Sequence, residues 1–170
     1  MKFPDLTQLR STRGLLVAGV AGAVVIAAVI VMAVNGFRYW NDKQVENARA
    51  EAVAAADRTV SAMFTYDFAS VDKELPKAAD NLSPDFREDY LKLITQAIAP
   101  GAKEKQLTVK ATTQASGVVE ADRDHVVVLL FLNQVTTSKD TPQGTTTGSR
   151  VRVALDKTDD RWLVDSVNPV

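Results

Sequence analysis

Residues 126–132 read Val-Val-Val-Leu-Leu-Phe-Leu, and every one of these side chains is apolar. Successive side chains of a β-strand point to opposite faces of the sheet, so a strand with one wet face alternates apolar and polar residues. This stretch therefore predicts a central strand that needs cover on both faces. Helices supply one cover, and the other is the sheet's own curvature, a partner subunit or an apolar ligand.

The residues before this stretch predict a neighbouring strand. After about Lys105, the apolar residues Leu107, Val109 and Ala111 alternate with polar ones, and a turn is expected at 121–124. This alternation is typical of a strand with one buried face. Gly117 interrupts the alternation, which predicts a bulge or bend at that position.

The residues after the central stretch predict a loop and two more strands. Residues 136–149 are polar throughout and predict a mobile loop. Strands are then expected at Arg150–Lys157 and Trp162–Val167, joined by a tight turn at 158–160.

The part of the chain ahead of the strands predicts helices. Residues 41–70 are rich in Ala and Glu, which are strong helix formers. Ser83-Pro84-Asp85 predicts the start of another helix, which we expect to stop at Pro100-Gly101. Helices followed by consecutive strands predict one α+β domain, with the helices packed on an antiparallel sheet of about four strands.

An uncharged apolar run, Gly14–Val34, precedes these elements. As a helix it spans roughly 30 Å, the thickness of a hydrocarbon core. A cleaved signal peptide is the alternative, but its apolar region covers only about 7–15 residues. We therefore predict an uncleaved transmembrane helix. Its anchoring side chains include Leu15, Val20, Val25, Ile30 and Val34, and its interfacial aromatic residues are Phe37, Tyr39 and Trp40.

Flanking charges predict the orientation of this helix. Lys2, Arg10 and Arg13 precede it, whereas acidic residues dilute the basic ones that follow it. The positive-inside rule then predicts a single-pass plasma-membrane protein with a cytoplasmic N-terminus. The expected organisation is a cytoplasmic segment at 1–13, a transmembrane helix at 14–36, a juxtamembrane helix at 37–70 and the rest of the extracytoplasmic domain at 71–170.

Composition excludes several classes of function. The chain has 20 Lys and Arg against 21 Asp and Glu, so no basic excess indicates nucleic-acid binding. It has no cysteine, no phosphate-binding glycine loop and no cluster of metal ligands. His125 is the single histidine and is interpreted as a strand-edge or core residue. No catalytic, cofactor or metal site is expected, although Tyr66 and Asp67 could in principle serve as donor and base.

Several segments together resemble a known family. They are TYDF (Thr65–Phe68), IAPGAKEK (Ile98–Lys105), ASGVVEADRDHVVVLLFLNQVTTSKD (Ala115–Asp140) and RVRVALDKTDDRWLVDSVNPV (Arg150–Val170). With the preceding membrane helix, they resemble the Mce-associated membrane proteins of actinobacteria. These are accessory proteins of the mammalian-cell-entry lipid importers. The resemblance implies a cone like that of nuclear transport factor 2, a curved antiparallel sheet wrapped around helices, and it supplies no catalytic motif.

Three functions follow from the residues and the resemblance. The first is a non-catalytic subunit that assembles or stabilises a lipid importer in the cell envelope, with the bilayer, the other importer subunits and related accessory proteins as partners. The second is a cone that binds a lipid between Phe64, Phe68 and Phe131. The third is a small isomerase-like or dehydratase-like enzyme that uses Tyr66, Asp67 or His125. The candidate partner or ligand contacts are Tyr66, Asp67, Phe68 and Phe131.

Overall fold

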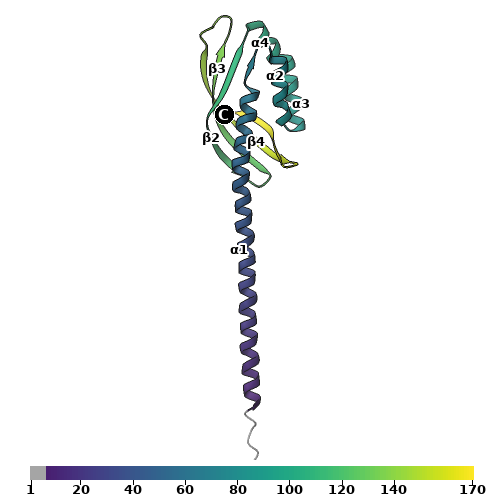
Figure 1. Cartoon of the computed structure of the whole chain (residues 1–170), viewed down its shortest axis with the longest axis vertical. Helices are drawn as coiled ribbons and strands as arrows, with labels where there is room; N and C mark the ends of the chain where they lie inside the picture. Colours follow the sequence, from purple (N-terminus) through teal and green to yellow (C-terminus); the bar gives the residue numbers. More distant parts are fainter. Residues whose placement is uncertain (1–6) are drawn as a thin grey trace, which may run out of the picture. The chain divides into compact units, whose positions relative to one another are not determined.

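The computed structural model describes the backbone of residues 7–170 and the side chains of residues 22 and 24–170. The chain divides into two units, Met1–Lys43 and Gln44–Val170. The elements in chain order are α1 (Thr7–Met63), β1 (Tyr66–Asp67), α2 (Val71–Ala78), the 3₁₀ turn η1 (Ala79–Asn81), α3 (Pro84–Leu93), the π-helical turn η2 (Ile94–Ile98), α4 (Ala99–Lys105), β2 (Thr108–Ala121), β3 (His125–Thr137), β4 (Thr145–Thr158) and β5 (Arg161–Pro169) (Figure 1).

The first unit holds the apolar part of α1. From Val24 onwards, the described part of α1 is long enough and apolar enough to cross a membrane. The apolar window of this helix has a mean hydropathy of 1.4. The predicted anchors Val25, Ile30 and Val34 are all more than half exposed, whereas the side chains of Leu15 and Val20 lie outside the described residues. The polar side chain of Asn35 is satisfied locally, because its amide donates to the carbonyl oxygen of Val31 at 2.7 Å. This part of α1 fits a single-pass membrane protein.

The second unit is built on a five-stranded antiparallel sheet in the order β1-β2-β3-β4-β5. The expected α+β class and meandering sheet are confirmed, with the two-residue β1 as an additional edge strand. The turn between β4 and β5 is also confirmed. Asp159 and Asp160 both have positive φ angles, 49° and 58°, as the two central residues of a tight hairpin require.

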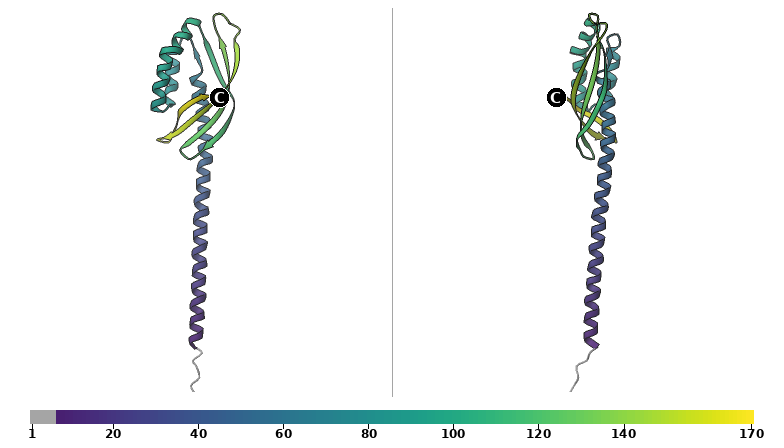
Figure 2. Two further views of the ribbon diagram at one scale, coloured as in Figure 1. Left: turned by 180° about the vertical axis from the view of Figure 1, so that it is seen from behind. Right: turned by 90° about the vertical axis from the view of Figure 1, so that its left-hand side faces the viewer.

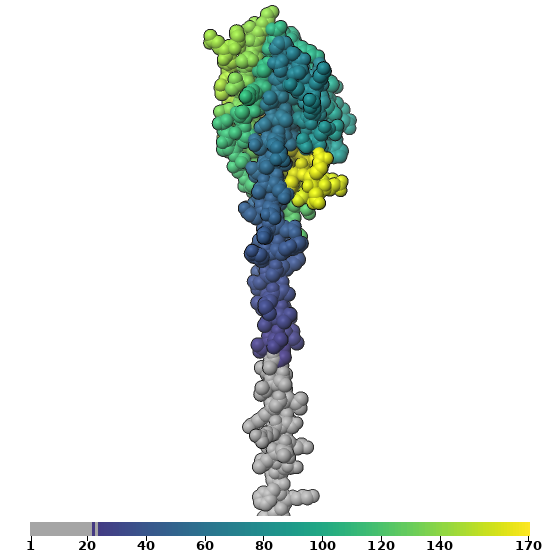
Figure 3. Space-filling model, in the orientation of Figure 1, coloured from purple at the N-terminus to yellow at the C-terminus, as the bar shows by residue number. Residues whose placement is uncertain are grey.

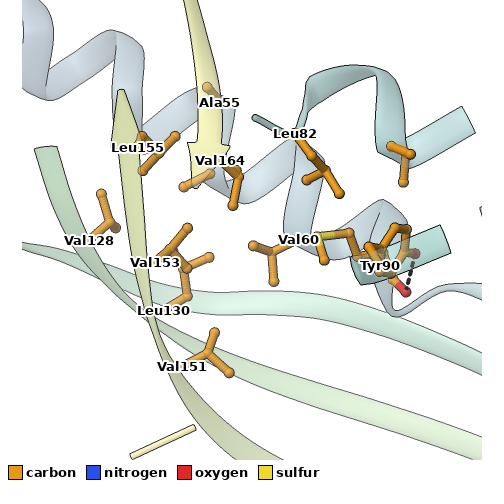
Figure 4. Close-up of a cluster of buried hydrophobic side chains, with 14 of the residues drawn as sticks. Ala55, Val60, Leu82, Tyr90, Val128, Leu130, Val151, Val153, Leu155 and Val164 are labelled. Atoms are coloured by element: carbon orange, nitrogen blue, oxygen red, sulfur yellow. Dashed lines mark hydrogen bonds between the residues drawn. The ribbon is translucent and has the colours of Figure 1, made fainter. Parts of the chain in front are cut away.

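Alternate side chains of the strands form the core on the inner face of the sheet. Val128, Leu130, Val153 and Leu155 are completely buried. Figure 4 shows them facing Val60 of α1, together with Val164 of β5 and Leu82. The part of α1 in this unit packs an apolar stripe against the core, and the buried members of the stripe are Ala48, Ala52, Ala55, Ala56, Val60 and Met63. Small alanine side chains let this helix approach the sheet closely.

The remaining helices complete the layer on the inner face. Figure 2 shows α2 and α3 side by side next to the sheet, and in the view of Figure 3 the part of α1 within this unit runs between these helices and the strands. Trp162 of β5 is buried, as expected for a core aromatic. Its indole Nε1 donates to the carboxylate of Glu51 on α1 at 3.1 Å, which ties the last hairpin to the helix.

Two predicted boundaries were wrong. The juxtamembrane helix ends at Met63 instead of Ser70, because Tyr66 and Asp67 leave the helical path and pair with β2. The expected loop at 136–149 is mostly strand. Thr136 pairs with Thr145, and only residues 138–144 connect β3 to β4. The threonines of this segment have high β propensity, so the long hairpin extends beyond the apolar core.

The expected helix stop at Pro100-Gly101 was also wrong. The helix continues to Lys105, and Pro100 occupies the first turn of α4. Pro100 has no backbone N–H to donate, and the π-helical turn directly before it already interrupts the regular hydrogen bonds of the α-helix. The π-helical turn before it closes with the Ala99 N–H donating to the carbonyl of Ile94, five residues back.

The expectation for Ser83 was met in position but not in hydrogen bonding, and the bulge expected at Gly117 was wrong. Ser83 occupies the N-cap position of α3, but its buried hydroxyl makes no capping hydrogen bond. Gly117 pairs regularly with Leu129, and the register shifts of β2 fall on either side of it, at Gln114 and Val119. The strand is therefore bulged twice, and neither bulge is at the glycine.

Candidate functional site

The outer face of the sheet carries an uncovered apolar strip along β3. Val127 and Leu129 are only partly buried, and Phe131 is 39% exposed. Directly opposite them lie small residues: Ala154 of β4 faces Val127, Gly117 of β2 faces Leu129, and Ala115 of β2 faces Phe131. Directly paired residues project from the same face, so these six residues form one surface, called the outer patch below.

The outer patch has a charged rim. On β4, Arg150 pairs with Phe131 and Arg152 pairs with Leu129, and both arginines are exposed. Neither forms an ion pair within the described part of the chain. Glu120 of β2, opposite Val127, is the acidic group at the other edge. An apolar centre with an aromatic residue and arginines around it matches the composition of protein–protein interfaces.

A second feature of this unit is a cavity of about 380 Å³ on its helical side. It lies between the end of α1, β1, α3, η2 and the end of β5. Its lining is almost entirely apolar and consists of Met63, Phe64, Tyr66, Phe86, Asp89, Tyr90, Leu93, Ile98 and Val167. The volume falls within the range of pockets that hold small molecules.

The four predicted contact residues are distributed over different places. Tyr66 lines the cavity and Phe131 belongs to the outer patch. Phe68 is partly buried against the core. Asp67 has a structural environment: its carboxylate accepts hydrogen bonds from the Thr108 hydroxyl at 2.7 Å and the Ala69 N–H at 2.9 Å, which lower its pKa. The expected pocket of Phe64, Phe68 and Phe131 was therefore wrong, since only Phe64 lines the cavity.

The residues proposed for catalysis do not converge. Tyr66 pairs with Val109 near the start of β2, whereas His125 follows the turn at the other end of that strand. Twelve residues of β2 lie between these ends, and a straight strand of that length would span roughly 40 Å. His125 instead pairs with Asp156 of the neighbouring strand β4, and the distance between its Nδ1 and the Oδ1 of Asp156 is 2.6 Å. A shared acid–base site would need groups within hydrogen-bonding reach.

Metal chemistry has no support in the described residues either. Among them, no three His, Asp or Glu side chains come together as a possible metal site. Structural zinc sites require four ligands and catalytic ones three, usually including His or Cys. The two candidate functional sites of the domain are thus the outer patch and the apolar cavity.

Sequence reasoning found parts of both features. The apolar run at 126–132 indicated that both faces of β3 need cover, and the outer patch lies on the face that the helices do not cover. The sequence did not predict that Leu93 and Ile98 lie together in the lining of the cavity. Five residues of α-helix would place them about 140° apart, and the π-helical turn that brings them together has no recognised sequence signal.

Comparisons with curated sequences identify mycobacterial relatives. The outer membrane protein Rv1973 of Mycobacterium tuberculosis (strain ATCC 25618 / H37Rv) is 38% identical over 139 residues, which cover 79% of this chain and 86% of the relative. The uncharacterized protein Rv1362c of the same strain is 37% identical over 135 residues, covering 78% of this chain and 61% of that protein. No family model matches the chain.

Solved structures share the fold. An IcmL-like type IV secretion system protein from Legionella pneumophila superposes with a TM-score of 0.62 at 16% identity, covering 72% of this chain and 91% of that one. The periplasmic domain of DotI gives 0.59 at 16% identity, with coverages of 69% and 91%. A periplasmic fragment of TraM gives 0.58 at 11% identity, with coverages of 71% and 96%. The domain thus has the nuclear-transport-factor-2-like fold.

Proposed function

The chain belongs to the family of the mycobacterial outer membrane protein Rv1973, and from this premise we propose that it is a non-catalytic subunit of a membrane complex in the cell envelope. More specifically, it assembles or stabilises a lipid importer of the mammalian-cell-entry type. The observation that carries the proposal is the outer patch: the central strand β3 leaves Leu129 and Phe131 uncovered beside Arg150 and Arg152 of β4, which have no ion-pair partner in the described part of the chain.

The fold and the distribution of titratable groups support a non-catalytic role. Of the structurally similar proteins, the IcmL-like protein is named as a type IV secretion system protein, and the matched parts of DotI and TraM are periplasmic. Fold likeness alone does not transfer a function. A non-catalytic role also agrees with the separation of Tyr66 and Asp67 from His125, which keeps these three candidates from acting at one site.

The importer assignment rests on sequence resemblance. The segments Thr65–Phe68, Ile98–Lys105, Ala115–Asp140 and Arg150–Val170 resemble Mce-associated proteins, and they include β1, β3 and the parts of β2 and β4 that carry the charged rim. The partners would be the membrane and substrate-binding subunits of the importer. A partner that fits the outer patch presents apolar side chains with acidic groups placed opposite Arg150 and Arg152.

We also propose a location and topology. Residues 14–36 cross the plasma membrane, residues 1–13 are cytoplasmic, and Phe37, Tyr39 and Trp40 lie at the membrane–water interface. The juxtamembrane residues and the domain up to Val170 are then extracytoplasmic. Fractionation of plasma and outer membranes tests the compartment. A reporter active only in the cytoplasm, fused after Val170, tests the topology, and strong activity would reverse it.

A pair of double variants tests the assembly function in the native host. Phe131→Ala with Arg150→Glu removes the aromatic centre of the outer patch and reverses one rim charge. Val135→Ala with Lys110→Glu is the matched control, because these two paired residues are an exposed apolar and a basic side chain outside the patch. The first variant should lower importer subunit levels and lipid uptake, and the control should leave both intact. Unchanged levels and uptake in the first variant would contradict the proposal.

A further inference from the structure

The cavity on the helical side leaves several large apolar side chains without full cover. Leu93 is 52% exposed, and Phe64, Phe86, Ile98 and Val167 are only partly buried. All five line the same cavity of about 380 Å³. Removing apolar surface from water is favourable at roughly 25 cal/mol per Å². An apolar occupant would therefore gain more here than on an ordinary polar surface.

The π-helical turn shapes this cavity. An α-helix places residues five apart about 140° from each other around its axis. A π-helical turn, in which the N–H of residue i+5 donates to the carbonyl of residue i, brings residues five apart to nearly the same side of the helix. Here Leu93 and Ile98 both line the cavity. Such turns occur frequently at functional sites. The helix thus departs from regular geometry where it borders the cavity.

The polar groups of the cavity are few and of different kinds. The Tyr90 hydroxyl is engaged, because it donates to the Met63 carbonyl at 3.1 Å. The Tyr66 hydroxyl has no hydrogen-bond partner among the residues that the structure describes. Burial raises the pKa of both phenols, so both stay neutral. Tyr66 therefore offers one uncharged hydrogen-bonding group inside an apolar lining.

The charge at the rim selects against anions. Asp89 lines the cavity with an exposed carboxylate, and Glu88 precedes it on α3. The nearby Lys92 lies closer to Glu88, at 2.7 Å, than to Asp89, at 3.9 Å. An acid entering here would meet an incompletely compensated negative charge. A ligand with a neutral polar end avoids this cost.

We propose that the cavity binds one molecule of an uncharged aliphatic alcohol, with its hydrocarbon against Phe86, Leu93 and Ile98 and its hydroxyl bonded to Tyr66. The site is independent of the outer patch, which lies on the other face of the sheet. A linear alcohol and a sterol share this chemistry. Either class of alcohol agrees with the proposal, and photolabelling with one probe of each class distinguishes a linear alcohol from a sterol.

Photolabelling of the full chain in lipid nanodiscs tests this site. The probes are a 16-carbon alcohol with a mid-chain diazirine, the corresponding carboxylic acid, and a diazirine-bearing sterol. Labelled residues are mapped by peptide mass spectrometry. At least one alcohol should label the Phe86–Ile98 region, unlabelled alcohol should compete, and the acid should label this region at least several-fold less.

Three variants make the test specific. Tyr66→Phe should reduce alcohol labelling about five- to tenfold, as expected for the loss of one hydrogen bond. Leu93→Trp fills the opening and should abolish labelling; since Leu93 is half exposed, the fold should tolerate this change. Tyr39→Phe, a tyrosine outside the cavity, should change nothing. Equal labelling by the acid, equal labelling of Tyr66→Phe, or labelling restricted to the membrane helix would overturn the proposal.

Discussion

The hydroxyl of Tyr90 on α3 donates a hydrogen bond to the carbonyl oxygen of Met63, 3.1 Å away, at the last residue of α1 (Figure 4). The last carbonyls of a helix have no partner within the helix. Tyr90 supplies one from a different element and is itself only 5% exposed. This contact fixes the end of the long helix where the chain turns into β1, beside the apolar cavity.

Replacing Tyr90 with Phe should therefore destabilise the domain. The variant leaves the Met63 carbonyl buried without this donor, at a cost of about 1–2 kcal/mol in the free energy of unfolding. Denaturant unfolding of the full chain in detergent measures the effect, with Tyr39→Phe as the control. Equal stability of Tyr90→Phe and the wild type would mean that the bond makes no net contribution.

Adjacent residues of β3 should differ sharply because they project from opposite faces. Leu130 is fully buried in the core, so Leu130→Ala should cost about 2–5 kcal/mol of folding free energy. Phe131 is 39% exposed on the outer patch, so Phe131→Ala should cost less, about 1–2 kcal/mol. Thermal or denaturant unfolding compares the two, and the reverse order would show that the faces of β3 are wrongly assigned.

Two glycines of the long hairpin provide another matched pair. Gly144 has φ +81°, and an added Cβ would lie 3.2 Å from Cγ2 of Thr137. Gly144→Ala should therefore destabilise the hairpin by about 1 kcal/mol or more. At Gly148 the nearest atom to an added Cβ is 3.8 Å away, so Gly148→Ala should be tolerated. Amide hydrogen exchange in residues 133–148 reports the difference, and similar exchange in both variants would contradict it.

The contact between α1 and the last hairpin should make stability depend on acid pH. Glu51 accepts hydrogen bonds from the Trp162 indole and from Lys157, and these hold its pKa below the usual 4.5. A lowered folded-state pKa stabilises the fold above pH 4.5, and this contribution is lost as pH falls through the folded value. Between about pH 5 and pH 3 the wild type should therefore lose more stability than Glu51→Gln. Parallel pH profiles would exclude this linkage.

The regular parts of the domain could be predicted because local patterns and tertiary packing agree. The alternation of Val151, Val153 and Leu155 identifies a strand that is buried on one face, and that strand packs as expected. The alanine-rich stripe likewise predicts the face of α1 that meets the core. In both cases one periodicity determines which side chains are buried.

The errors arose where tertiary pairing overrides local composition. The threonine-rich segment at 136–149 has no apolar face, yet it pairs as a hairpin because backbone hydrogen bonds continue beyond the core. Tyr66 and Asp67 lie in a sequence suited to a helix but pair with Val109 and Thr108. Phe131 was predicted to share a pocket with Phe64, and strand alternation instead places it on the other face of the sheet.

Site-specific crosslinking in the native membrane tests the central claim most directly. A photoreactive phenylalanine analogue is placed at Phe131 in the outer patch or at the exposed Glu88 on α3, and crosslinked proteins are identified by mass spectrometry. The account predicts covalent adducts with subunits of a mammalian-cell-entry type importer from position 131 and none from position 88. The account would be contradicted if the adducts from position 131 contained no importer subunits, or if both positions captured them equally.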